Sequence, residues 1–306
     1  MKKRTLGIFL LLLTAFIWGL AFIAQRTGAE SIDPFTFSTT RMLLGGFALL
    51  PILIIIDIKR LKGTNHKEKA KSKKAVQKTI ISGVILGIVF CIACNFQQFA
   101  LEYSSAGKVA FITAFYILLV PIFSLVLKHK VPAISWLGSG LGLVGLFLLC
   151  VNVSDLTSFN LGDLLALFGA LFFAIHILLV EKYASEVDGL KLSCIQLLVG
   201  GIISMPLMFI FESPSWVAIS SAIVPILYAG ICSCGIAYTL QIIGQRYVEP
   251  SLATLVMSME SVFAVVLASI ILREAMSVSE TIGCVVMLIA IVTPQIWEIA
   301  KSKKKI

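Results

Sequence analysis

The chain alternates long apolar runs with short polar segments along its whole length. Ten of these runs hold roughly 20 residues, which is long enough for a helix to cross the hydrocarbon core of a bilayer. The pattern therefore predicts an all-α integral membrane protein with ten transmembrane helices. The expected spans are residues 6–25, 35–56, 79–101, 105–127, 131–151, 161–181, 191–211, 218–244, 248–272 and 278–297.

The second half of the chain repeats the first. Identical residues recur 155 positions later, among them Asp33 and Asp188, Gly45 and Gly200, and Pro51 and Pro206. Around the fourth and ninth spans the offset becomes 144, which pairs Tyr116 with Glu260. Five spans per half is an odd number, so the second half must enter the membrane with the opposite orientation. We predict two inverted five-helix repeats, residues 1–151 and 152–306, an arrangement typical of solute carriers.

Basic residues concentrate on one side of the predicted topology. Of 25 Lys and Arg residues, 21 fall on the side of the chain termini and three on the other, with Arg41 inside a span. This bias predicts that both termini are cytoplasmic. It also predicts that the net charge of +9 meets anionic lipid headgroups rather than nucleic acid. The lysine-rich segment 58–78 is expected to be a mobile cytoplasmic loop. The basic and apolar start of the chain resembles a signal peptide, but its apolar run is long, so we interpret it as an uncleaved first span.

The cysteines and glycines give no indication of a cofactor. All seven cysteines fall inside predicted spans, and the pairs Cys91/Cys94 and Cys232/Cys234 lack a nearby His or second pair that would complete a metal site. Small apolar packing residues are the simpler interpretation. The chain also lacks the Gly-x-x-x-x-Gly-Lys motif that cradles nucleotide phosphates. We therefore predict no metal, no cofactor and no ATP-driven step.

Two charged side chains lie deep within predicted spans, where charge is costly and function is a common reason for it. Arg41 is suited to binding a carboxylate or phosphate through two parallel hydrogen bonds, or it extends to the headgroups or to a neighbouring helix. Its counterpart in the second half is the neutral Gln196. Glu260 either carries a proton during transport or donates a hydrogen bond that locks two helices. Its counterpart Tyr116 shares this candidate gating or coupling role.

Uncharged polar and aromatic residues supply the remaining candidates. Amides in the third and eighth spans either line a polar cavity or hydrogen-bond between helices. His176 is able to titrate near neutral pH, although a lone His is more often a packed hydrogen-bonding group. The cavity candidates are Trp18, Arg41, Asn95, Gln98, Tyr238 and Gln241; the gating or coupling candidates are Glu260, His176 and Tyr116.

Several short segments, in order, resemble the drug/metabolite transporter superfamily, in particular its EamA-type ten-span members. These are Trp18-Gly19, Arg41, residues 100–107 (ALEYSSAG), residues 245–250 (QRYVEP), residues 258–260 (SME) and Leu272-Arg273-Glu274. The family often has proline after the positions of Tyr116 and Glu260. This chain has Ile117 and Ser261 there, which puts a helix break at those points in doubt.

The resemblance implies a plasma-membrane carrier of small metabolites, often an exporter of amino acids or related solutes. With the inverted repeat, it leads to the hypothesis of a bacterial secondary transporter that works by alternating access. Proton coupling, exchange and facilitated diffusion stay open, as does the oligomeric state. The alternatives are an intramembrane enzyme, for which no nucleophile–base or paired-carboxylate motif is present, and a non-transporting membrane scaffold or sensor.

Overall fold

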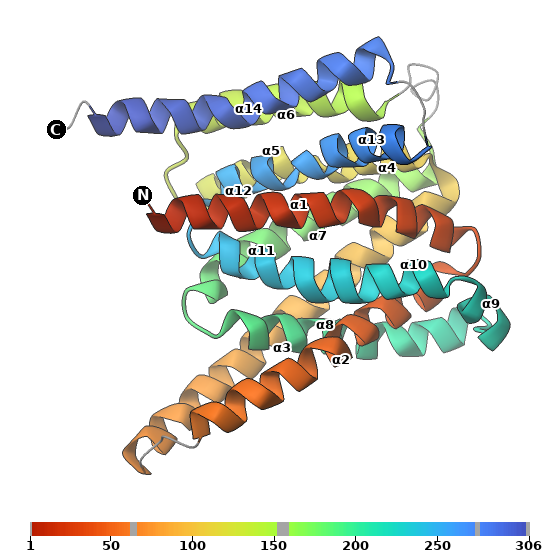
Figure 1. Ribbon diagram of the computed structural model, residues 1–306, viewed down its shortest axis with the longest axis vertical. Helices are drawn as coiled ribbons and strands as arrows, with labels where there is room; N and C mark the ends of the chain where they lie inside the picture. The colour runs from red at the N-terminus through yellow and green to blue at the C-terminus, as the bar shows by residue number, and fades with distance from the viewer. Residues whose placement is uncertain (1, 62–65, 152–158, 273–275, 304–306) are drawn as a thin grey trace.

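The computed structural model describes residues 2–61, 66–151, 159–272 and 276–303. Helices account for the architecture of these residues, and they run side by side in one bundle (Figure 1). The first half contains α1 (Lys2–Ala29), α2 (Pro34–Leu61), α3 (His66–Tyr103), α4 (Ala106–Thr113), α5 (Tyr116–Val126) and α6 (Ala133–Cys150). The second half contains α7 (Leu161–Ala184), α8 (Gly189–Phe211), α9 (Trp216–Ser221), α10 (Ile223–Leu227), the π-helix η2 (Tyr228–Ala237), α11 (Tyr238–Gln245), α12 (Pro250–Met257), α13 (Met259–Leu272) and α14 (Val278–Lys303).

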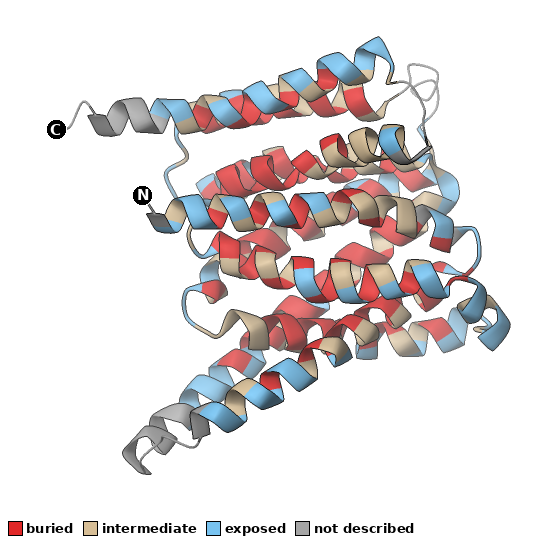
Figure 2. Cartoon of the chain, viewed as in Figure 1, coloured by how far each residue is buried: buried red, intermediate tan, exposed pale blue. Residues whose placement is uncertain are grey.

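The ten predicted spans are confirmed. Ten stretches of the described helices are long and apolar enough to cross a membrane. Both ends of the chain lie at the same end of the bundle, as an even number of crossings requires (Figure 1). We call this the terminal end and the opposite one the distal end. Large apolar side chains such as Phe47 and Ile202 are exposed on the outside of the bundle, where lipid would surround them (Figure 2).

The expectation of a loop over residues 58–78 is wrong. Helix α2 continues to Leu61 and α3 already begins at His66, so helical structure covers most of this segment. Residues 62–65 lie outside the described part of the chain. The segment is rich in Lys, Glu, Ala and Gln, which are good helix formers. Extending an existing membrane helix also avoids the cost of nucleating a new one.

The helix contacts show the two-fold relation between the repeats. Gly46 on α2 lies against Leu198 on α8, and the counterpart glycine Gly201 lies against Leu43, the counterpart of Leu198. The fifth span of each repeat pairs in the same reciprocal way: Gly145 meets Met287, and Gly283 meets Leu149. Such exchanged contacts require a pseudo-two-fold axis between α2 and α8 and between α6 and α14. The fold is therefore two inverted five-helix repeats.

Reciprocal contacts also join the ends of α2 and α8. At the distal end, the Glu212 carboxylate accepts hydrogen bonds from the backbone N–H groups of Phe35 and Thr36, each at 2.7 Å. At the terminal end, the Lys191 ammonium lies 2.7 Å from the Asp57 carboxylate. At the 155-residue offset, the counterpart of Thr36 is Lys191 and the counterpart of Asp57 is Glu212. An acid at the end of each helix thus holds the beginning of the other.

The fourth and ninth spans are both interrupted, at counterpart positions. The fourth breaks after Thr113, and the Ile117 N–H bonds the Ala114 carbonyl three residues back instead of four. The ninth breaks at Ser258, and the Ser261 N–H bonds the Ser258 carbonyl in the same manner. The breaks that the absence of proline put in doubt are therefore present. In the ninth span, hydroxyl groups supply one cause: the Ser258 side chain donates to the Leu255 carbonyl at 2.8 Å and competes with the backbone ladder.

Candidate functional site

A cavity of about 50 Å³ lies on the pseudo-two-fold axis, inside the bundle. Ten of its residues form five counterpart pairs at offsets of 155 or 144: Trp18/Phe173, Phe22/Ile177, Gln97/Gln241, Thr113/Met257 and Tyr116/Glu260. Four other polar residues line the cavity although their counterparts in the other repeat do not: Gln25, Arg41, Ser233 and Tyr238. The inverted repeat therefore forms the cavity, and its unpaired residues set the polarity.

The π-helix η2 accounts for two of the unpaired residues. Ser233 lies within it and Tyr238 follows its last residue. The corresponding part of the first repeat belongs to the continuous α-helix α3. A wider turn rotates the following side chains relative to a regular α-helix, so the same position in the two repeats points in different directions. π-Helical turns of this kind often occur at functional sites.

Arg41 is the most informative group in the cavity. Arg41 is only 4 % exposed, and its Nη1 atom donates a hydrogen bond to the Gln25 Oε1 atom at 2.9 Å. The Phe37 ring lies below the guanidinium, 5.5 Å from Cζ. The Nε and Nη2 atoms are buried without a hydrogen-bond partner. These two nitrogens form one edge of the planar guanidinium, the edge that binds both oxygens of a carboxylate. No carboxylate within the described residues forms an ion pair with Arg41.

Other unpaired polar atoms gather around the same cavity. The buried Trp18 Nε1, Thr113 Oγ1 and Gln241 Oε1 atoms also lack partners, and all three residues line it. Buried polar atoms in proteins are hydrogen-bonded in the great majority of cases, so a cluster of exceptions calls for an explanation. A polar ligand or water in the cavity would supply the missing partners.

Tyr116 and Glu260 face the same cavity from the two repeats. Both side chains line it, close enough to interact electrostatically. Counterpart residues that lie so close together must lie near the pseudo-two-fold axis. Each follows the break in its span by one to three residues. The pair therefore lies where both interrupted helices are least regular.

Three other sequence candidates lie outside the cavity lining. The Asn95 Nδ2 atom donates to the Cys91 carbonyl at 2.8 Å and reaches Ser204 on α8 at 3.3 Å. The Nε2 atom of His176 lies 3.0 Å from the Oε1 atom of Gln196, the counterpart of Arg41. Gln98 is fully buried and both atoms of its amide lack partners. These three side chains pack between helices in this structure.

Two residues that line the cavity, Gln97 and Gln25, are not among the cavity candidates selected from the sequence. The 144-residue offset maps Gln241 onto Gln97 rather than onto Gln98, so applying it one span earlier would have selected the amide that lines the cavity. One residue along a helix rotates the side chain by about 100°, which is enough to move it from the cavity to a helix interface. For Gln25 the sequence holds no comparable signal, because its counterpart is the apolar Val180.

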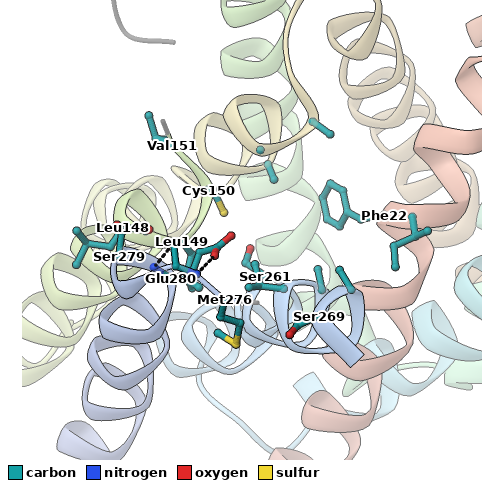
Figure 3. Close-up of a pocket in the computed structure, with 18 residues that line it drawn as sticks. Phe22, Leu148, Leu149, Cys150, Val151, Ser261, Ser269, Met276, Ser279 and Glu280 are labelled. Carbon is teal, nitrogen blue, oxygen red and sulfur yellow. Dashed lines mark hydrogen bonds between the residues drawn. The ribbon is translucent and has the colours of Figure 1, made fainter. Parts of the chain in front are cut away.

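A larger pocket of about 540 Å³ opens at the distal end (Figure 3). It lies between α4 and α13, with residues of α1 on one side and the facing ends of α6 and α14 on the other. Phe22 lines both this pocket and the axial cavity, so its side chain stands between them. The Glu280 side chain at the wall accepts from the Ser277 N–H at 2.7 Å and so caps α14. The fifth and tenth spans thus contribute to this pocket.

Among the described residues, the counterpart positions at the terminal end are packed rather than open. Ten distal-pocket residues on α1, α4 and α13 have counterparts on α7, α12 and α5. Nine of the ten counterparts are buried, whereas only one of the ten residues that line the distal pocket is buried. At the terminal end α12 packs directly on α5. At the distal end the pocket separates their counterparts α4 and α13.

A buried ion pair fixes the start of α7 at the distal end. The Lys108 ammonium lies 2.7 Å from the Asp163 carboxylate, whose side chain is fully buried. Asp163 also accepts from the Asn160 N–H and the Ser104 hydroxyl, at 2.9 and 3.0 Å. Lys108 is thus held inside the protein. Within the described residues, no three His, Cys, Asp or Glu side chains gather as a metal site would require.

Comparisons with known proteins identify the family. A model of the EamA-like transporter family matches twice, over residues 5–151 and 160–293. A protein of Archaeoglobus fulgidus named as an uncharacterized transporter is 29 % identical over 95 % of this chain and 86 % of its own length. The transporter YoaV of Bacillus subtilis is 24 % identical over 94 % of both chains. The inner membrane transporter YedA of Escherichia coli is 24 % identical over 90 % of this chain and 87 % of its own.

One solved crystal structure has the same fold, with a TM-score of 0.77, 16 % sequence identity, and coverage of 95 % of this chain and 96 % of the other. The ten spans, the reciprocal helix contacts and the axial cavity agree with the family match over both halves. The chain belongs to the EamA-like transporter family, and it is a multi-pass membrane transporter of a small-molecule substrate.

Proposed function

We propose that the protein is a secondary transporter that exports a small carboxylate-bearing metabolite, such as an amino-acid-like solute, across the plasma membrane. The observation that carries this proposal is the free Nε/Nη2 edge of Arg41 in the axial cavity. A buried guanidinium without an acidic partner is costly inside a membrane. A substrate carboxylate bound at that edge would offset the cost and be held by two charge-assisted hydrogen bonds.

Alternating access is the proposed mechanism. The cavity of about 50 Å³ has room for a few waters but not for a metabolite, so the helices around it must separate to admit one. The distal pocket supports a path towards the cavity from that end, whereas the counterpart positions at the terminal end are packed. The distribution of basic residues supports a cytoplasmic terminal end. Export then runs from the terminal end to the distal end.

The domain division supports the same mechanism. We assign residues 1–151 and 152–306 as the two repeats; the proposed boundary adjoins residues 152–158, which lie outside the described part of the chain. Phe22 on α1 and its counterpart Ile177 on α7 both line the cavity. Each therefore stands on the path from the cavity to one end of the bundle.

The test begins with an untargeted comparison of metabolites in cells with and without the protein. The solute that changes most is then used for counterflow in proteoliposomes of wild type, Arg41→Ala and Arg41→Lys. A hydrogen bond to a charged group contributes about 1.5–3 kcal/mol, so losing both should raise KM at least tenfold for Arg41→Ala. Arg41→Lys should recover only part of this, because an ammonium lacks the planar fork.

Gly140→Ala is the matched control, because a methyl group there meets nothing within 4 Å. Wild-type KM for Arg41→Ala, with normal amounts of inserted protein, would remove Arg41 from the substrate site. No counterflow of any solute by wild-type protein would overturn the transport proposal itself.

A further inference from the structure

A groove of about 290 Å³ lies at the terminal end of the bundle, between α3 and the last turn of α7; we call it the α3–α7 groove. Its lining is Lys74, Gln77, Lys78, Ile81, Ser82 and Tyr183. We propose that this groove binds the headgroup of an anionic phospholipid from the surrounding leaflet, with the lipid phosphate held by the two lysines. The inference concerns the bilayer around the protein and does not depend on the transported solute.

The first observation is the depth of the groove in the membrane. Helix α7 ends at Ala184, directly after Tyr183, and the Lys78 ammonium on α3 lies 3.0 Å from the Glu186 carboxylate just beyond that end. Tyrosine at the end of a span is typical of the headgroup region, where the ring and its hydroxyl meet different surroundings. Helix α3 begins twelve residues before Lys78, at His66, so it continues past this level beside α2 (Figure 1). The groove therefore lies at the height of the lipid headgroups.

The second observation is the positive charge of the groove. Lys74 is exposed and forms no ion pair within the described residues. Lys78 is paired with Glu186, but the two side chains are 53 % and 39 % accessible, and exposed pairs of this kind hold their partners weakly, so a phosphate can share the ammonium. A third ammonium, that of Lys182, lies 5.4 Å from the centre of the Tyr183 ring. Three ammonium groups beside one carboxylate favour an anionic ligand, and the cytoplasmic leaflet is the one that supplies anionic lipid.

The third observation is an apolar row that leads from the groove towards the hydrocarbon core. Ile81 lines the groove and is 52 % exposed, and Ile88, seven residues further along α3, is 42 % exposed. Residues seven apart lie on the same face of an α-helix, so the two form a row on the outer surface of α3. An acyl chain attached to a headgroup in the groove would lie along this row. A free phosphate ion gains nothing from it, so the row favours a lipid as the occupant.

The counterpart segment at the distal end lacks these features. At the 144-residue offset that relates these spans, the counterpart of Lys74 is Ala218 and the counterpart of Lys78 is Ala222. Residues 216–227 include no Lys or Arg. The inverted repeat therefore does not require the lysines of the groove. Their restriction to the terminal end is expected of a site for anionic lipid, because the basic-residue bias supports a cytoplasmic position for that end.

Thermal unfolding of the delipidated protein in detergent tests the inference. The unfolding temperature is measured with phosphatidylglycerol, with phosphatidylcholine and with inorganic phosphate, each at the same concentration. A ligand that binds the folded protein but not the unfolded chain raises this temperature. Phosphatidylglycerol should raise it clearly, whereas phosphatidylcholine and inorganic phosphate should change it little. An equal rise with phosphatidylcholine, or with inorganic phosphate, would overturn an anionic lipid as the occupant.

Variants separate a defined site from a general attraction between basic residues and lipid. Lys74→Gln/Lys78→Gln should lose at least half of the rise, and Lys74→Arg/Lys78→Arg should keep it. Lys128→Gln/Lys130→Gln is the matched control, because it removes two exposed lysines that follow α5 at the same end, and it should also keep the rise. Equal losses in the groove and control variants, or no loss in either, would contradict the site. Lys74→Gln alone preserves the comparison should the double variant fail to insert.

Native mass spectrometry of the same proteins adds a count of bound lipid. After phosphatidylglycerol is added, the wild type and the Lys128→Gln/Lys130→Gln control should each retain one lipid more than Lys74→Gln/Lys78→Gln. Equal counts in all three proteins would place the bound lipid elsewhere and reject the α3–α7 groove as its site.

Discussion

The helix pair α2–α8 and the pair of interrupted spans, α4–α5 and α12–α13, both lie on the pseudo-two-fold axis, yet they are built differently. Helices α2 and α8 interlock through Gly46 and Gly201 and are joined at both ends by an acidic side chain. The interrupted spans place Tyr116 and Glu260 in the cavity, next to a break in each helix. The comparison indicates that one pair is a fixed support and the other is able to rearrange.

The difference also explains how a single cavity combines binding with movement. Arg41 belongs to α2, the fixed helix, so the anion-binding group would keep its position during transport. Tyr116 and Glu260 belong to the interrupted spans and would change their surroundings. Gly46 and Gly201 each receive a leucine side chain from the facing helix, which opposes sliding of α2 along α8.

The largest expected effect follows from overfilling the fixed pair. A Cβ at Gly46 would lie 2.6 Å from a Leu198 side-chain carbon and 3.2 Å from the Leu198 backbone nitrogen. Gly46→Val should therefore destabilise the protein by about 1–3 kcal/mol or prevent its insertion. Thermal unfolding of purified protein in detergent measures this. Gly140→Val, at a position with open space, should unfold at the wild-type temperature. Equal decreases of the unfolding temperature in both variants would contradict a stabilising role of the α2–α8 contact.

The next effect concerns the charge that the fixed pair presents to the cavity. Gln25 is a neutral partner of Arg41 and leaves its positive charge uncompensated. Gln25→Glu would place an acid there, and the resulting ion pair should raise KM for a carboxylate solute at least tenfold while the maximal rate changes little. Counterflow kinetics provide the measurement. A Gln25→Glu variant with unchanged KM would mean that the net charge at Arg41 does not select the solute.

A several-fold effect on rate is expected in the interrupted spans. Glu260→Gln keeps the side-chain volume but removes the acid that faces Tyr116 in the cavity, so it should lower the flux with little change in the unfolding temperature. Tyr116→Phe should lower the flux similarly, because it removes the hydroxyl on the opposite side of the same pair. Flux is compared with and without an imposed pH gradient. A wild-type flux that ignores the gradient would limit Glu260 to a gating role and exclude it as a proton carrier.

The smallest effect is expected at the terminal end of the fixed pair. The Asp57–Lys191 ion pair is partly exposed, with side chains 42 % and 27 % accessible. Exposed pairs contribute about 0–1 kcal/mol, so Asp57→Asn should barely change the unfolding temperature. Glu212→Gln should cost more, because the carboxylate holds two backbone N–H groups of α2. Equal changes in the two variants would contradict a difference between these end contacts.

Sequence alone predicted the span positions, because twenty apolar residues in a row have few alternatives in a membrane protein. It also indicated the inverted repeat through identical residues such as Gly45 and Gly200. It misjudged segment 58–78, where helix propensity extended two spans beyond the apolar run. It did not find Glu212 as the residue that caps α2, since that contact joins positions 177 residues apart.

The site was only partly predictable for a geometrical reason. Arg41 and Glu260 stand out because charged side chains are rare in the middle of membrane spans. Tyr116 stands out because it is the counterpart of Glu260. Amides are common in membrane helices, and whether Gln97 or Gln98 faces a cavity depends on the rotation of α3 about its own axis. That rotation is set by packing against other helices, which no single span encodes.

Distances between spin labels in liposomes test the central claim most directly. Labels at the exposed positions Glu102 and Ile270 report the distal gap, and their counterparts Arg246 and Val126 report the terminal gap. Labels at Phe47 and Ile202 report the α2–α8 pair. Double electron–electron resonance should show two populations in which the distal distance shortens as the terminal distance lengthens, with one unchanged distance for α2–α8. A change in the α2–α8 distance, or gaps that widen together, would contradict the account.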